Sequence, residues 1–491
     1  AGDLYQTMVV TNPNVHFGLG NRSKADVVRI TWTNGVPQNI FLPDADQALI
    51  EAQILKGSCP FLYTWNGEKY VFAKDIIWRS ALGMPLGIMG GKSMHAFPDA
   101  SDDYIKIPSD IIKPKNDEYL IQVTSELWET IYIDKIQLVA VDHPDSVDIF
   151  VPEQFSPPPF PGLDIYQVHK KITPISATDA DGNDVLSFIT KKDDNYLSDF
   201  KSDKYQGTTK THDLILDPGD VGKHKNLFIF LNGWIFPTDA SINEALSQSD
   251  NFKMMSPVIQ VKNSKGKWET VIDNLGFPMG KDKTVIADLS GKFLTKDHKI
   301  RIRTNMEIYW DEIFFSDANP KVPIVSTVLN PIYADIHYRG FSHSYKKGGR
   351  YGPHWFDYDK VDKNVKWRDL AGNYTRYGDV KPLLLASDNK YIISNAGDET
   401  SIRFDAKALP VLKEGWKRDF LIHSVGWVKD GDINTALGST VLPLPFHGMV
   451  SYPPSDEDIY PKNAELQKYN QEYNTRAITT EPYRNAIKSN N

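Results

Sequence analysis

Oxygen-bearing side chains alternate in one short run near the C-terminal end of the chain. Asp430, Asp432 and Asn434 occupy every second position of DGDIN. Such side chains in a turn can converge on Ca²⁺, which accepts roughly six to eight oxygen ligands. A complete EF-hand loop also needs a glycine and a distal glutamate at fixed positions, and these are missing. The run therefore predicts either a calcium site or a metal-free Asx turn.

A second acidic turn lies in TDADGNDV. A cation would relieve the repulsion between its close carboxylates, and Ca²⁺ suits such ligands. The alternative is a solvated hairpin tip with Gly182 at positive φ, which needs no metal. The candidate ligands are Asp179, Asp181, Asn183 and Asp184, and a weaker case of the same kind is formed by Asp99, Asp102 and Asp103.

Aromatic and basic side chains gather between residues 337 and 358. Aromatic faces and arginine can stack on a sugar ring, a peptide or another subunit. The alternative is that these aromatics seal the edge of a sandwich core, since exposure cannot be read from one sequence. The candidate recognition surface comprises Tyr338, Arg339, Tyr351, His354, Trp355 and Tyr358, with His337 and His343 nearby.

No motif in the chain supplies a reaction. Asp311 and Glu312 form a carboxylate pair, but neighbouring strand residues point to opposite faces and so cannot flank one bond. The sequence has no Gly-x-Ser-x-Gly elbow and no His-Glu-x-x-His helix. GIMGGKS at 87–93 lacks the opening glycine of a phosphate-binding loop. The chain is therefore expected not to be an enzyme.

Composition argues against nucleic acid as a partner. The net charge is −8 over 491 residues, whereas phosphate binding needs a basic stripe. Lys170–Lys171 and Lys191–Lys192 are short runs that predict solvated turns. The single cysteine, Cys59, excludes an intrachain disulfide and is expected to be a small buried side chain.

The chain carries no membrane-spanning pattern, since it lacks an apolar stretch of about 18 residues. Its first residues, AGDLYQTM, are neither basic nor apolar and do not form a signal peptide. A processed, mature N-terminus would explain this.

Short runs rich in Val, Ile, Tyr and Phe, separated by Gly, Asn, Asp and Pro turns, predict an all-β, mainly antiparallel fold. The expected architecture is several β-sandwich or jelly-roll-like units with few short helices. One helix is expected behind an N-cap at Asp239 or Ser241, and another within 463–477.

Proline-rich sequence at 151–162 and a break near 317–323 divide the chain. The predicted division is an N-terminal β domain at 1–55, a β-rich domain at 56–150, a linker at 151–162, a β-sandwich at 163–318, a C-terminal β-rich domain at 319–460 and a polar tail at 461–491.

Residues 15–53 combine a glycine turn at Gly18 and Gly20, an alternating strand at 27–32 and a turn at Asn34-Gly35. This run resembles the ASPIC/UnbV domain at the C-terminal end of secreted FG-GAP repeat proteins, the cartilage acidic protein-like family. Later segments are similar to the C-terminal regions of large bacterial members: 56–80, 126–144, 230–248, 302–315, 373–384 and 415–435.

The resemblance implies an exported protein, secreted or periplasmic. The chain is expected to be the C-terminal part of a longer precursor with an upstream FG-GAP propeller, either as a cleaved product or as a fragment. The expected function is a non-catalytic binding or structural role, in adhesion or as a subunit of a surface or periplasmic assembly. Expected partners are other protein subunits, surface glycans or the N-terminal part of its own precursor. Two alternatives are a carbohydrate-binding or glycan-cleaving protein and an accessory subunit of an extracytoplasmic electron-transfer complex.

Overall fold

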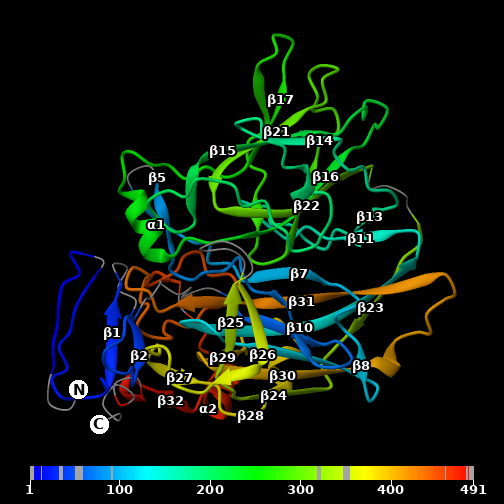
Figure 1. Ribbon diagram of the computed structural model, residues 1–491. Coiled ribbons are helices and arrows are strands. Elements are labelled where there is room, and N and C mark those ends of the chain that lie inside the picture. Colours follow the sequence, from blue (N-terminus) through cyan, green and yellow to red (C-terminus); the bar gives the residue numbers. More distant parts are fainter. Residues whose placement is uncertain are drawn as a thin grey trace.

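The computed structural model describes residues 5–12, 14–32, 37–49, 59–89, 92–317, 322–346, 354–458, 460–482 and 485. Over these residues the chain forms two β-sandwiches, which lie one above the other in Figure 1. The long strand pairs of both sandwiches are antiparallel. The predicted all-β, mainly antiparallel class is confirmed.

The first sandwich contains two sheets built from segments at both ends of the chain. The five-stranded sheet has the order β23 (Val325–Leu329), β10 (Glu129–Pro144), β31 (Trp416–Asp430), β7 (Ser101–Ile107), with β29 (Ile392–Ser394) also on β10. The seven-stranded sheet has the order β28 (Gly378–Asp379), β24 (Tyr333–Tyr338), β30 (Asp398–Asp405), β9 (Glu118–Thr124), β3 (Phe61–Trp65), β4 (Tyr70–Asp75), with β8 (Pro114–Lys115) on β9.

A β-bulge in β10 decides which side chains reach the core of this sandwich. Before the bulge Ile131 and Ile133 enter the core, and after it Ile136 and Leu138 do. The register against β31 shifts between Ile133 and Lys135, and the extra residue changes the parity of the inward positions. The strand therefore buries apolar side chains in one core on both sides of the bulge.

The second sandwich is formed by the central part of the chain, drawn in green at the top of Figure 1. Its larger sheet has the order β14 (Ser176–Asp179), β15 (Thr208–Asp217), β21 (Ile300–Met306), β17 (Val258–Lys262), β18 (Trp268–Ile272). Its smaller sheet has the order β20 (Lys283–Asp288), β16 (Phe228–Ile235), β22 (Ile308–Ser316). Side chains of both sheets share one apolar core, among them Leu231, Val285 and Ile302.

Further strand pairs lie outside these sheets. Within the described residues they are β1 (Val27–Thr31) with β2 (Pro37–Phe41), β5 (Pro85–Met89) with β6 (Lys92–His95), β11 (Asp148–Phe150) with β13 (Tyr166–Val168), β12 (Gln154–Phe155) with β19 (Phe277–Pro278), β25 (Phe341–Lys346) with β26 (His354–Asp362), and β27 (Gly372–Tyr374) with β32 (Arg476–Ile478). The strand expected at 27–32 is present as β1, while the Asn34-Gly35 turn lies outside the described residues.

Two short α-helices each begin at a capping side chain. Asp239 Oδ1 accepts a hydrogen bond from Ile242 N, 2.8 Å away, at the start of α1 (Ala240–Ser247). Asn463 caps α2 (Ala464–Tyr473) in the same way through Leu466 N. Both predicted helices are confirmed, and within the described part of the chain no helix has the length and apolar character to cross a membrane. The structure also contains the 3₁₀ segments η1 (Leu186–Phe188), η2 (Lys381–Leu384) and η3 (Ala406–Ala408).

Strand pairing joins segments that the sequence predicts to be separate. Strand β10 from 56–150 pairs with β31 from 319–460, and β9 pairs with β30 in the other sheet. The segments 56–150 and 319–460 therefore share one sandwich instead of forming two units. Residues 151–162 also differ from a simple linker, because Glu153 is buried and the following pair of residues forms β12.

An ion pair links the two sandwiches at their junction. Lys283 of β20 donates from Nζ to Asp75 Oδ1 of β4 over 2.6 Å, and neither side chain is exposed by more than 1%. Lys281 N donates to the same oxygen over 2.9 Å. Burial raises the pKa of Asp75, but the two lysines outweigh burial and hold it below its ordinary value.

Glu129, at the start of β10, has a raised pKa, because burial outweighs the groups that lower it. Burial raises its pKa to about 8, although Cys59 N donates to Oε2 over 2.8 Å. Between the ordinary value of 4.5 and about 8, the unfolded chain releases a proton that the folded chain retains. Rising pH therefore lowers the free energy of unfolding across this window. Cys59 itself is buried, as the sequence predicts.

Glu129→Gln is expected to raise the free energy of unfolding at pH 8 by about 1–3 kcal/mol, since each pKa unit corresponds to about 1.4 kcal/mol. The amide keeps an oxygen for Cys59 N but has no proton to lose. At about pH 4 both proteins have a neutral side chain when folded, so their stabilities are expected to agree. Urea unfolding at both pH values measures this, and a variant less stable than the wild type at pH 8 contradicts it.

Candidate ligand-binding site

A cavity of about 350 Å³ lies beside the end of β24 in the first sandwich. Its walls come from segments far apart in the sequence, from the β24–β25 region to β32 near the C-terminal end. Aromatic and polar side chains line it together, among them Tyr338, Phe341, Trp367 and Tyr377, with Asp369, Asn395 and Arg476.

The aromatic side chains divide into a buried base and two exposed faces. Phe341 and Trp367 are buried, whereas Tyr338 and Tyr377 are each 42% exposed. The Tyr338 ring packs against Gly397, where a Cβ atom would approach Tyr338 Cε2 to 2.6 Å. Gly397 also has a φ of +88°, which disfavours any other residue there. The close approach of backbone and ring fixes the position of Tyr338.

Arg476 organises the polar side of the cavity. Its guanidinium lies 4.2 Å from the centre of the Tyr377 ring and donates from Nη2 to Asp398 Oδ2 over 2.5 Å. The Tyr377 hydroxyl donates to Asp398 Oδ1 over 2.9 Å. Asp398 is buried, so these charge-assisted hydrogen bonds are little screened by solvent. Arg476 and Tyr377 are therefore held in place as a stacked pair.

Asp369 is a titratable group of this cavity. Burial raises its pKa to about 6, the Asn395 side chain lowers it, and the nearby charge of Asp398 raises it again. Asn395 Nδ2 donates to Asp369 Oδ1 over 2.9 Å. This carboxyl can accept hydrogen bonds from a ligand when ionised and donate one when protonated.

The structure separates the predicted recognition residues. Tyr338 lines the cavity, but Arg339 is buried, with Nη1 3.4 Å from Glu126 Oε1 and Nε 3.2 Å from Glu399 Oε2. The Tyr358 ring lies 4.1 Å from the Arg339 guanidinium and 5.0 Å from the ring of Tyr63. These contacts match the alternative in which aromatics seal a sandwich edge.

Of the other predicted recognition residues, those that the structure describes do not line the cavity. Trp355 packs against the buried aromatic cluster of the second sandwich, and His354 lies 6.3 Å from the Trp234 ring of that cluster. His337 contacts Asp335 and Glu399, and His343 is exposed on β25. Tyr351 lies outside the described residues.

The turn at Asp430, Asp432 and Asn434 is tied to helix α1. Asp432 Oδ1 accepts hydrogen bonds from Ser241 Oγ and from Asn434 N, at 2.7 and 2.8 Å. Asn434 Nδ2 donates to Ser241 Oγ over 2.8 Å, and Asp430 Oδ1 accepts from Asp432 N over 3.2 Å. The side chains therefore act as Asx-turn acceptors and as an anchor for the start of α1.

The turn at Asp179, Asp181, Asn183 and Asp184 has a similar internal pattern. Asp179 Oδ1 accepts from Asp181 N and Asn183 N, and Oδ2 accepts from Asn183 Nδ2. Asp184 Oδ1 accepts from Leu186 N over 2.9 Å. Among the described residues, no group of three or more His, Cys, Asp or Glu side chains is arranged to hold a metal ion.

The melting temperature is expected to be the same in EDTA and in millimolar CaCl₂, because the turn carboxylates already accept hydrogen bonds from the chain. Calcium binding at either turn stays a prediction of the sequence alone. A cation that binds only the folded state must raise the melting temperature. A higher melting temperature in CaCl₂ would contradict this expectation and support a calcium site in the folded protein.

Other acidic candidates have basic or backbone partners. Asp102 and Asp103 contact His423 and Arg79, at 2.7 and 2.6 Å, while Asp99 is exposed. Asp311 accepts hydrogen bonds from the backbone N–H groups of residues 193 and 194, and Glu312 binds Lys171. The two adjacent carboxylates thus have separate partners, as strand geometry requires.

Comparison with known proteins identifies one part of the chain. Residues 7–53 match the family model described as ASPIC and UnbV, which supports the resemblance of the N-terminal segment. No curated protein matches the chain. A solved structure of the Gx strain of infectious bursal disease virus aligns with 77% of this chain and 76% of its own, at 10% identity. Its TM-score of 0.12 is too low to support any conclusion about fold or function.

Proposed function

We propose that this protein is a non-catalytic, glycan-binding protein of the cell exterior that acts in adhesion or in a surface assembly. The observation that carries the proposal is the cavity in which Tyr338 and Tyr377 present exposed faces beside Arg476, Asn395 and Asp369.

The chemistry of this cavity suits a sugar ring. Tyrosine faces offer a flat apolar surface to the C–H face of a sugar, and the phenol keeps a polar edge. Arg476 keeps one further N–H donor on Nη2, and Asn395 and Asp369 supply groups that can exchange hydrogen bonds with hydroxyls. The volume of about 350 Å³ lies near the lower end of small-molecule sites, at roughly 300–1,000 Å³.

The proposed location rests on the N-terminal segment. Residues 7–53 match the ASPIC and UnbV model. By resemblance, such a domain is expected at the C-terminal end of secreted FG-GAP repeat proteins. A secreted or periplasmic protein would meet surface glycans or other protein subunits. A role as an accessory subunit of an extracytoplasmic electron-transfer complex stays a separate prediction, which native mass spectrometry of the isolated assembly would test.

Binding of the fluorescently labelled full chain to a glycan array tests the proposal. We expect a small set of related glycans to retain the protein, because one cavity selects one ring geometry. The proposal is contradicted if the array retains the protein on no glycan. It is also contradicted if all glycans retain the protein equally, including glycans that differ from one another only in their hydroxyl groups.

Glycan cleavage is the second candidate, favoured by the Asp369 pKa of about 6. A hydrolase needs a second working carboxylate roughly 5–10 Å from the first. The neighbour Asp398 is held by Arg476 and Tyr377, and Glu481 is the other carboxylate that lines the cavity among the described residues. Because the proposed role is binding, we expect no release of reducing ends from a bound glycan. Release that Asp369→Asn abolishes, with binding retained, would establish cleavage instead.

A further inference from the structure

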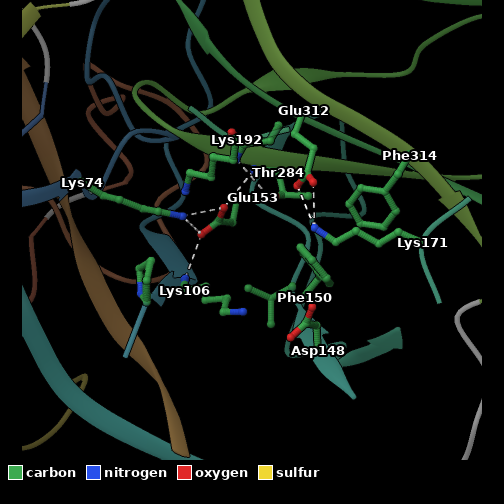
Figure 2. A pocket seen from close by; sticks show the side chains of 13 residues that line it. Lys74, Lys106, Asp148, Phe150, Glu153, Lys171, Lys192, Thr284, Glu312 and Phe314 are labelled. Atoms are coloured by element: carbon green, nitrogen blue, oxygen red, sulfur yellow. Dashed lines mark hydrogen bonds and ion pairs between the residues drawn. The ribbon is translucent and has the colours of Figure 1, made fainter. Parts of the chain in front are cut away.

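A second cavity, of about 380 Å³, lies at the junction of the two sandwiches (Figure 2). Lys74 of β4 and Lys106 of β7 enter it from the first sandwich. Thr284 of β20, with Glu312 and Phe314 of β22, enters from the second. This junction cavity shares no lining residue with the aromatic cavity.

Four lysine side chains line the junction cavity: Lys74, Lys106, Lys171 and Lys192. Figure 2 shows Lys74 directed at Glu153 and Lys171 directed at Glu312, with Nζ–Oε1 distances of 2.7 and 2.8 Å. Lys106 and Lys192 have carboxylate partners in Asp419 and Asp282, at 3.1 and 2.8 Å. The carboxylates hold the four ammonium groups around one space.

Donor capacity remains on the two more exposed of these lysines. An ammonium group has three N–H donors. Lys171 Nζ donates to the two carboxylate oxygens of Glu312, and Lys192 Nζ donates to one oxygen of Asp282. The side chains of Lys171 and Lys192 are 34% and 40% exposed, so an anion can reach them from outside.

Asp148 contributes acceptor oxygens to the cavity. Its side chain lines the cavity and is 44% exposed, and Lys417 Nζ donates to its Oδ1 atom over 2.5 Å. A carboxylate accepts several hydrogen bonds, so a hydroxyl group of a ligand can also donate to Asp148. Phe150 and Phe314 add apolar surface to the same cavity.

We propose that the junction cavity binds a hydroxylated carboxylate of the size of one sugar ring, namely a uronate. Its carboxylate contacts Lys171 or Lys192, a hydroxyl donates to Asp148, and its apolar face contacts Phe150 or Phe314. The uronate is either a free monosaccharide or one residue of an acidic polysaccharide. This site is independent of the aromatic cavity and does not rest on the function proposed for it.

Isothermal titration calorimetry of the full chain tests this inference with three probes: glucuronate, glucose and an oligogalacturonate. We expect glucuronate to bind at least about ten-fold more tightly than glucose, because hydrogen bonds to charged groups are the stronger ones. Equal affinities for the monosaccharide and the oligomer would indicate that the ligand is a free sugar acid. Tighter binding of the oligomer would indicate that the ligand is part of an acidic polysaccharide. Absence of uronate binding, or equal binding of glucose, overturns the inference without any variant.

Lysine variants place the ligand in the cavity. Lys171→Met or Lys192→Met, whichever of these lysines contacts the ligand carboxylate, is expected to weaken uronate binding about ten-fold or more, since methionine keeps the stem and loses the ammonium. Lys210→Met is the matched control, because Lys210 is an exposed lysine paired with Asp203 on the surface. Tyr377→Ala is expected to leave uronate binding unchanged, which separates this site from the aromatic cavity. Full affinity in both cavity variants overturns the assignment.

Discussion

Asp75→Ala is expected to lower the free energy of unfolding by about 3–5 kcal/mol. The carboxylate faces Lys283 Nζ at 2.6 Å, and the Lys283 side chain is fully buried. Removing Asp75 leaves this ammonium without its closest counter-charge in a place that water does not reach. Because the pair joins β4 of one sandwich to β20 of the other, the loss also weakens the junction between them. Urea unfolding of wild type and variant at neutral pH measures the difference.

Two controls separate this effect from the simple loss of a carboxylate. Asp203→Ala removes the partner of exposed Lys210 and is expected to cost less than about 1 kcal/mol. The double variant Asp75→Leu with Lys283→Met removes both charges and is expected to recover much of the lost stability. A stability of Asp75→Ala within about 1 kcal/mol of the wild type contradicts the assignment of this pair as an interior link.

Arg339→Ala is the second change with a large expected effect, also about 3–5 kcal/mol of stability. The guanidinium lies between Glu126 and Glu399, which are both 3% exposed. It also donates from Nη2 to the carbonyl oxygen of Tyr358 over 2.5 Å. Without Arg339 two buried carboxyl groups lose the cation that they share. Thermal melting followed by circular dichroism measures the loss.

A structural role and a recognition role for Arg339 predict different results. Arg403→Ala is the matched control, since Arg403 is an exposed arginine near Glu118 and its loss is expected to cost less than about 1 kcal/mol. Arg339→Lys is expected to retain only part of the stability, because an ammonium lacks the fork that reaches both glutamates. If Arg339→Ala keeps the stability of the wild type but loses ligand binding, Arg339 has a recognition role and not a structural one.

Local patterns predict much of the fold. The period-2 runs identify the all-β class, and the capping residues Asp239 and Asn463 mark both helices. Long-range pairing is not available from such patterns. Gln137 of β10 lies opposite His423 of β31, 286 positions further along the chain, and nothing local to either strand names its partner. The shared sandwich therefore becomes visible only in the structure.

The candidate sites depend on the same long-range pairing. Tyr338 can be selected from the sequence as an aromatic residue of the aromatic cavity. Arg476 reaches the same cavity because β32 pairs with β27, and Tyr377 reaches it because β28 pairs with β24. Lys171 and Lys192 fall in short runs typical of surface turns, whereas the structure places both at the junction cavity. The spacing of residues along the chain does not predict the lining of either cavity, because each cavity is lined by residues from strands and loops that are far apart in the sequence.

The most direct test of the account is calorimetric titration of an array-selected glycan into wild type, Tyr377→Ala and Tyr345→Ala. Tyr345 is a matched control, because it is 46% exposed on β25 and does not line the aromatic cavity. We expect Tyr377→Ala to weaken binding about ten-fold or more, since it removes a stacking face and a partner of Arg476. Tyr345→Ala is expected to bind like the wild type. Equal affinity of wild type and Tyr377→Ala would contradict glycan recognition by this cavity.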